Sequence, residues 1–168
     1  MSLSPSCRQM DTLKRQTQHQ IWVDADACPK VSRDILCRAA LRTTTTVVFI
    51  SNHSLSVPKS IYITNILVGK GFDKADDYIT ARVSAGDLVI TADVPLAQAI
   101  IEKGGGVLDP RGRVYSDDNI KERIAIRDVA QTLREGRLLH GGPQPYGTKQ
   151  RQKFANELDK WLRQSGTC

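Results

Sequence analysis

Five aspartates of this sequence stand at positions from which their carboxylates could act together: Asp24, Asp26, Asp76, Asp77 and Asp93. Three or more carboxylates held within a few ångströms of one another repel, and each raises the pKa of the others. A hard divalent cation relieves that repulsion, because it binds carboxylate oxygens, keeps several waters and takes a substrate phosphate as a further ligand. The residue set therefore favours metal-assisted hydrolysis of a phosphate ester.

Two of these positions depend on strands that must lie side by side in a sheet. The apolar residues 21–23 end at Asp24, and the apolar residues 88–90 lead to Asp93. In an open parallel sheet, ligands bind beyond the carboxyl ends of the strands. Asp24 and Asp93 share that edge if the two strands are neighbours, whereas Asp87 begins its strand and is expected at the opposite edge.

Capping of helices and turns is the alternative role for these side chains. Aspartate is common at helix N-caps and in turns, and Asp26 and Asp76 both stand where caps are needed. Asp24 and Asp93 fit this role less well, because both follow apolar strands at the same predicted edge.

Strand and helix patterns alternate from residue 21 to residue 109. Apolar or β-branched runs predict strands at residues 21–23, 45–50, 61–68, 88–90 and 107–108, and helical periodicity predicts helices at 29–41, 74–86 and 95–103. This alternation is typical of βαβ units. Helices then cover both faces of the sheet, because such crossovers share one hand. The predicted fold class is α/β, a three-layer α/β/α arrangement with a mainly parallel sheet.

The chain of 168 residues has room for one compact domain. Residues 1–19 show no periodicity and are predicted to be a disordered leader, so that residues 20–168 form a single domain. Helical patterns at 117–134 and near the carboxyl end predict two further helices, with a loop at residues 141–143 between them. No apolar run approaches the ~20 residues of a membrane helix, and no signal-peptide pattern occurs. We therefore expect a cytoplasmic protein with reduced cysteines.

The charge balance favours a polyanionic partner. Lysine and arginine number 24 against 18 acidic residues, which gives a formal net charge of +6. Aromatic residues make up only 5% of the chain, so base stacking is not the expected mode of binding. Phosphate contacts predict RNA as a partner. The candidate contact residues are Arg33, Lys74, Arg111, Arg113 and Arg127. A solvated polar face is the alternative reading of such charges.

Several motifs occur in one order along the chain: VDADACP at 23–29, GFDKADD at 71–77, DLVITADVPLA at 87–97, DPRG at 109–112 and GGP at 141–143. From residue 21 to its carboxyl end, the sequence resembles the YaiI/YqxD family of uncharacterised bacterial proteins. That family is in turn distantly similar to the PIN-like metal-dependent nucleases. The resemblance therefore implies a PIN-like domain.

The PIN-like site uses an Asp after the first strand, an acid at the start of a mid-chain helix, and an Asp after a later strand in a Ser/Thr-x-Asp setting. Asp24, Asp77 (or Asp76) and Asp93 match those positions. The resemblance thus implies a ribonuclease that depends on Mg²⁺ or Mn²⁺. Its catalytic metal ligands are Asp24, Asp77 and Asp93, with Asp26 and Asp76 as further ligands. In one departure, Pro95 stands where many PIN-like proteins carry a further acid.

Two other functions compete with the nuclease interpretation. Asp24 and Asp26 fit the DxD pair of haloacid-dehalogenase-like phosphatases, in which Asp24 would form an aspartyl-phosphate. Against this assignment, Pro29 begins a helix where that fold inserts a hairpin. The third possibility is a non-catalytic RNA-binding protein, which would use the basic helix near the carboxyl end together with the region of Arg111, Arg113 and Arg127. His53, which follows the second predicted strand, is expected to be an exposed loop residue.

Overall fold

The structure is a computed structural model that describes residues 18–71, 73–136 and 145–165. The predicted loop at 141–143 and most of the predicted leader lie outside these residues. The two described residues of the leader contact the rest of the chain. Gln18 Nε2 donates a hydrogen bond to the carbonyl oxygen of Thr44 at 3.2 Å, and His19 Nδ1 lies 3.9 Å from Asp87 Oδ1.

Six strands form one sheet in the order β3-β2-β1-β4-β5-β6. They are β1 (Ile21–Asp24), β2 (Val47–Ser51), β3 (Ile63–Leu67), β4 (Leu88–Ile90), β5 (Gly106–Leu108) and β6 (Val114–Tyr115). Strands β1 to β5 are parallel, and β6 pairs antiparallel with β5. The mainly parallel sheet is confirmed. Strand β6 was not predicted, because two residues are too few to show an alternating pattern.

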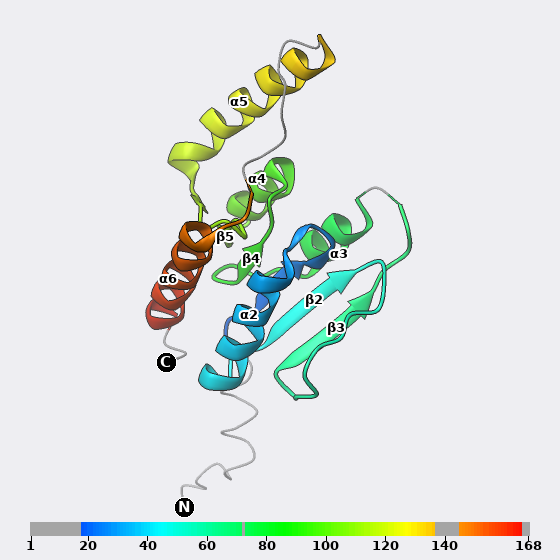
Figure 1. The fold of residues 1–168 in the computed structure, drawn as a ribbon, viewed down its shortest axis with the longest axis vertical. Coiled ribbons are helices and arrows are strands. Elements are labelled where there is room, and N and C mark those ends of the chain that lie inside the picture. Colours follow the sequence, from blue (N-terminus) through cyan, green and yellow to red (C-terminus); the bar gives the residue numbers. More distant parts are fainter. Residues whose placement is uncertain (1–17, 72, 137–144, 166–168) are drawn as a thin grey trace, which may run out of the picture.

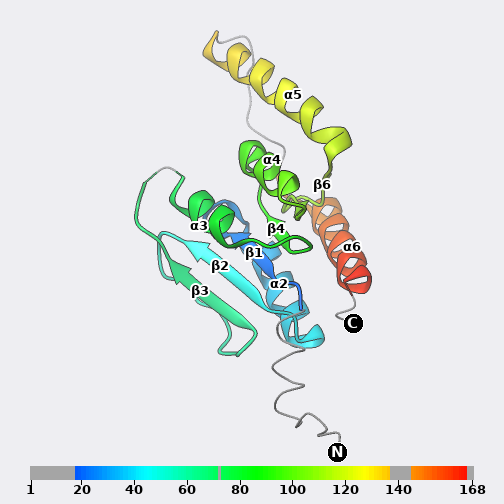
Figure 2. The same ribbon diagram turned by 180° about the vertical axis from the view of Figure 1, so that it is seen from behind.

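Helices cover both faces of the sheet, which confirms the three-layer α/β/α class (Figures 1 and 2). After the short 3-10 helix η1 (Ala25–Ala27), the helices are α2 (Lys30–Thr43), α3 (Lys74–Arg82), α4 (Val94–Glu102), α5 (Asp117–Glu135) and α6 (Thr148–Gln164). Helices α2 and α6 lie on one face and α3 and α4 on the other, while α5 extends away beyond α4. In the described part of the chain, no helix has the length and apolarity needed to span a bilayer.

The central strand β1 is buried along its whole length. Because successive side chains of a strand point to opposite faces, Ile21 and Val23 pack in the core under α2 and α6. Trp22 packs in the opposite core under α3 and α4. Burial on both faces explains why β1 is a continuous apolar run rather than an alternating one.

The amino-terminal edge of the sheet is held by the buried carboxylate of Asp87. Its oxygens accept hydrogen bonds from the backbone N–H groups of Gln20 and Ser84 and from Trp22 Nε1, each at 3.0 Å. Asp87 thus lies at the edge opposite to Asp24, as the strand direction predicts. The bond to Ser84 also explains why α3 ends at Arg82, four residues before the predicted end, since Ser84 N–H is no longer free to continue the helix.

We expect Asp87→Asn to lower the free energy of unfolding by about 1–3 kcal/mol, because an amide NH₂ would face at least one buried donor in either orientation. Urea unfolding followed by circular dichroism measures this change. Asp128→Asn, an exposed change on α5, is the control and should shift the free energy by less than about 0.5 kcal/mol. Equal stability of Asp87→Asn and wild type would contradict this role of Asp87.

Candidate functional site

The two central strands that carry the predicted aspartates are neighbours. Strand β1 pairs with β4, and Val23 lies opposite Ile90. The chain leaves β1 toward α2 on one face and leaves β4 toward α4 on the other. Such a reversal of strand order opens a crevice at the carboxyl ends of the two strands, which is where open α/β sheets bind ligands. Asp24 ends β1, and Asp93 lies just beyond β4.

A cavity of about 410 Å³ lies at this edge of the sheet. We call it the acidic cavity, because five carboxylates contribute to its wall: Asp24, Asp26, Asp73, Asp76 and Asp93. Lys74 and Asn52 also line it. Four of the five predicted aspartates are therefore brought together.

Asp77 is not among the residues that line the acidic cavity. It is exposed on α3, and its backbone N–H bonds the carbonyl of Asp73 at 2.8 Å. Neighbouring residues of a helix point about 100° apart, so the rotation of α3 about its axis decides how each member of the Asp76–Asp77 pair is placed. The structure turns Asp76 toward the cavity.

The pKa values of two carboxyl groups in this cavity are raised to about 6 from an ordinary value of 3.8. Asp24 is 9% exposed. Burial raises its pKa most, followed by the charges of Asp26 and Asp93, while a 3.4 Å hydrogen bond from Thr91 Oγ1 opposes the rise. For Asp76 the causes are burial and then four carboxylates, of which Asp93 and Asp24 contribute most. Negative charge in the cavity is thus only partly neutralised by its surroundings.

Asp93 combines a capping role with its place in the cavity. Its Oδ1 accepts a hydrogen bond from Leu96 N–H at 3.0 Å, which caps α4. Thr91 Oγ1 accepts a bond from Asp93 N–H at 3.0 Å. The side chain is therefore fixed in orientation, with one oxygen engaged in the cap.

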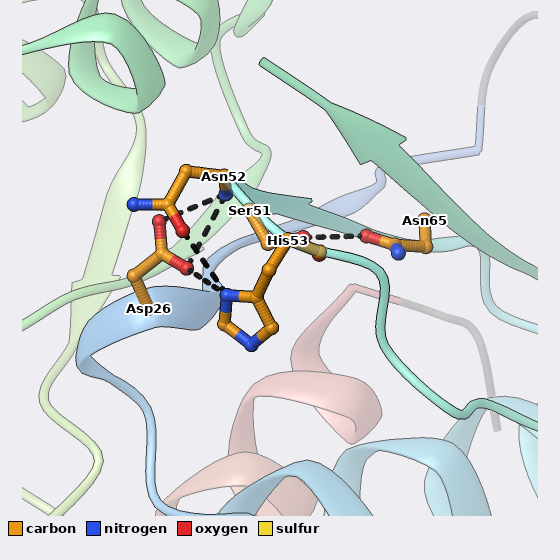
Figure 3. Close-up of polar contacts among 5 residues, drawn as sticks. All are labelled: Asp26, Ser51, Asn52, His53 and Asn65. Carbon is orange, nitrogen blue, oxygen red and sulfur yellow. Dashed lines mark hydrogen bonds and ion pairs between the residues drawn. The ribbon is translucent and has the colours of Figure 1, made fainter. Parts of the chain in front are cut away.

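Asp26 is held by the loop that follows β2 (Figure 3). Its carboxylate accepts the backbone N–H of Asn52 at 3.1 and 3.3 Å, and His53 Nδ1 lies 3.2 Å from Asp26 Oδ1. Ser51 Oγ bonds Asn65 Oδ1 at 2.9 Å, which links the loop to β3. His53 is exposed, as predicted. The sequence did not indicate its pairing with Asp26, because His53 and its neighbour Asn52, which is 26 positions from Asp26, are brought to Asp26 only by the fold.

A divalent cation fits the charge of the acidic cavity. Within the described ranges, no Lys or Arg forms a salt bridge with Asp24, Asp76 or Asp93. The same residues contain no group of three Asp, Glu, His or Cys side chains placed so that together they could hold a metal ion. Mg²⁺ is ordinarily held by one or two carboxylates and several waters. The charges therefore suit a hydrated ion, although the carboxylates do not form a closed coordination shell.

A second, larger cavity of about 770 Å³ lies between β6, α5 and α6. We call it the basic cavity, because seven cationic side chains line it: Arg111, Arg113, Arg123, Arg127, Arg134, Lys149 and Lys153. Three of the predicted RNA contacts, Arg111, Arg113 and Arg127, are among them. Ala92 and Val94, the neighbours of Asp93, line it too, so the basic and acidic cavities both border the turn between β4 and α4.

The other two predicted RNA contacts lie outside the basic cavity. Lys74 lines the acidic cavity, and Arg33 lies in a groove along α2. Arg123 and Arg134 were not predicted as contacts, and Lys149 and Lys153 were expected only as part of the basic helix near the carboxyl end. Their meeting at one cavity could not be predicted, because α6 is far from β6 and α5 in the chain and only the fold brings these cations together.

Comparisons with known proteins identify the family. Residues 22–164 match the family described as "Uncharacterized BCR, YaiI/YqxD family". A UPF0178 protein of Pectobacterium carotovorum is 54% identical over 146 residues, which cover 87% of this chain and 97% of that protein. UPF0178 proteins of Yersinia pestis (51% over 146 residues, 87% and 96%) and Legionella pneumophila (50% over 142 residues, 84% and 96%) are also similar.

The resemblance to the YaiI/YqxD family is thereby confirmed. The comparison with solved structures found no match. The distant similarity to PIN-like nucleases therefore stays a prediction.

The raised pKa of Asp24 predicts a stabilising substitution with a defined pH dependence. Because the folded state holds this proton up to about pH 6 and the unfolded state only to about 3.8, stability falls as the pH rises from about 4 to 6 and stays lowered above it. Asp24→Asn removes that cost. It should raise the free energy of unfolding by about 2 kcal/mol at pH 7.5 and by less than half as much at pH 4.5.

Urea unfolding at the two pH values measures this difference. Asp87→Asn is the matched comparison. The Asp87 carboxylate already accepts three hydrogen bonds, so the substitution should destabilise the protein at pH 7.5. A loss of stability for Asp24→Asn at both pH values would contradict the account.

Proposed function

The chain belongs to the YaiI/YqxD family, and we propose that it is a ribonuclease that hydrolyses phosphodiester bonds with the aid of Mg²⁺ or Mn²⁺. The observation that carries this proposal is the acidic cavity, where Asp24, Asp76 and Asp93 converge without a cationic partner among the described residues. Carboxylates that raise one another's pKa in a cleft are typical of functional sites.

Of Asp24, Asp76 and Asp93, one or two would bind the ion directly and the rest through its water molecules. Asp26 would line the adjoining wall of the cavity. A bound divalent ion supplies a more acidic water and neutralises charge that develops on the phosphate. Asp24 is largely ionised above pH 7, since its pKa is about 6, so its carboxylate is ready to bind a cation there. Protons compete for the same oxygens at lower pH, which makes metal affinity pH-dependent.

The basic cavity supports a polyanionic substrate. Each arginine can give a phosphate two parallel hydrogen bonds, which both bind and orient it. Both cavities border the turn that carries Asp93, so an RNA strand held by phosphate contacts along α5 and α6 would pass beside the carboxylates. Lys74, at the acidic cavity itself, is placed to contact that group.

The phosphatase alternative gains no support from the residues around Asp24. The chain passes from β1 through η1, and only Cys28 and Pro29 separate η1 from α2. This leaves no room for the hairpin of that fold. Asp26, which would be the acid of the DxD pair, is held by Asn52 and His53.

Mn²⁺ titration by calorimetry separates the two adjacent aspartates of α3. We expect Asp76→Asn to weaken Mn²⁺ binding at least about tenfold, because it removes a carboxylate that faces the cavity. Asp77→Asn should stay within about threefold of wild type, because that side chain faces solvent. Equal binding by wild type and Asp76→Asn would remove the metal assignment. Loss of Mn²⁺ binding in Asp77→Asn alone would make Asp77, which the PIN-like resemblance names first, the metal ligand in place of Asp76.

The activity itself is measured with end-labelled RNA in the presence of Mn²⁺, Mg²⁺ or EDTA. We expect cleavage by wild type with either metal, none with EDTA, and at least a hundredfold less with Asp24→Asn. RNA binding without cleavage would favour the non-catalytic alternative, and an aspartyl-phosphate trapped by fluoroberyllate would favour the phosphatase. Either result would overturn the ribonuclease proposal.

A further inference from the structure

A third hollow, of about 530 Å³, runs between α2 and the loop at residues 53–58. We call it the α2 groove. Three cations from α2 line it, namely Lys30, Arg33 and Arg38, against one acid, Asp34. None of these cations forms a salt bridge with a described residue. The lining therefore carries more positive than negative charge, and its three cations have no ion-pair partner within the described chain.

Arg33 carries the most specific signal in this groove. Its Nε is buried and has no hydrogen-bond partner among the described residues. A buried donor without an acceptor is unfavourable, and an oxyanion bound against this guanidinium would supply the missing acceptor. The planar guanidinium matches phosphate oxygens in a paired arrangement that lysine cannot reproduce.

The groove also has room for more than a phosphate. It is lined from Lys30 to Leu41 of α2, a length of about 16 Å at 1.5 Å per residue. Beside the three cations, the lining includes apolar side chains, among them Leu41 of α2 and Val57 of the loop. This combination suits a nucleotide unit, whose phosphate and base need different surroundings.

The α2 groove shares a wall with the acidic cavity. His53 lines the groove, Asp26 lines the cavity, and the two side chains are 3.2 Å apart (Figure 3). On the other side, the basic cavity and the acidic cavity both border the turn between β4 and α4. The acidic cavity thus lies between two cationic hollows. Along the sheet, the α2 groove is next to the loop after β2, the acidic cavity is at the ends of β1 and β4, and the basic cavity is on the side of β5 and β6.

We propose that the α2 groove is a phosphate-binding subsite, in which Arg33 holds a phosphate of the RNA strand on the side of the acidic cavity opposite to the basic cavity. This inference rests on the proposed function for the identity of the strand. The phosphate contact itself requires no metal and no catalysis, so it is tested separately.

The test is fluorescence anisotropy with a labelled single-stranded RNA in EDTA, where metal-dependent cleavage cannot occur. Arg33→Gln should weaken binding about tenfold or more, as expected for loss of a charge-assisted hydrogen bond. Arg33→Lys should also weaken it, because it keeps the charge but removes the buried Nε. Arg38→Gln, a change at an exposed groove residue, should weaken binding too and provides a second variant if Arg33→Gln folds poorly.

Lys59→Gln is the matched control. Lys59 is an exposed cation directly after the loop, it does not line the groove, and its substitution should change affinity less than about twofold. Equal losses of RNA affinity for Arg33→Gln and Lys59→Gln would show only general attraction between charges and would overturn the proposal. Wild-type RNA affinity of both Arg33→Gln and Arg38→Gln would overturn it too. Titration with adenosine monophosphate tests the other source of phosphate. Loss of its binding in Arg33→Gln with unchanged RNA affinity would assign the groove to a small ligand and exclude the strand.

Asp24→Asn separates this proposal from the ribonuclease proposal. It should retain RNA binding in EDTA, because it removes only negative charge from the acidic cavity. Loss of cleavage together with intact, Arg33-dependent binding supports both proposals. Absence of cleavage by wild type would overturn the nuclease alone.

Discussion

Repulsion between carboxylates that the backbone holds at one edge of a sheet is the constraint on which this structure depends. The pairing of β1 with β4 fixes Asp24 near Asp93, and the first turn of α3 adds Asp76. The same sheet shows how a buried carboxylate is stabilised when its role is structural, since three donors satisfy Asp87 at the opposite edge. The acidic cavity has no such set of donors. Its cost to stability is the kind that proteins carry at functional sites.

The acidic cavity has its place in the distribution of charge over the whole molecule. A chain of net charge +6 gathers carboxylates in one central cavity and places cations in the basic cavity and the α2 groove on its two sides. Cations at the sides attract a polyanion, and the carboxylates between them repel it unless a metal ion intervenes. In the proposed function, a divalent ion is therefore the element that would join substrate binding to the chemistry.

Much of the fold could be predicted from the sequence, because the strands are buried on both faces and stand out as apolar runs such as residues 88–90. The site was predicted as far as strand direction determines it, which includes Asp24, Asp93 and the exclusion of Asp87. The choice between Asp76 and Asp77 could not be made, because it depends on how α3 is rotated about its axis. The meeting of the cations of α5 and α6 at one cavity was likewise beyond sequence reasoning, since it depends on how those helices pack.

The most direct measurement is anomalous diffraction at the manganese edge from crystals soaked in Mn²⁺. The account predicts a peak in the acidic cavity, within direct or water-mediated reach of Asp24, Asp76 and Asp93, which is absent from crystals of Asp24→Asn. A cavity without a peak at millimolar Mn²⁺, or manganese bound only at other acidic positions, would contradict the claim that these carboxylates converge to hold a metal ion.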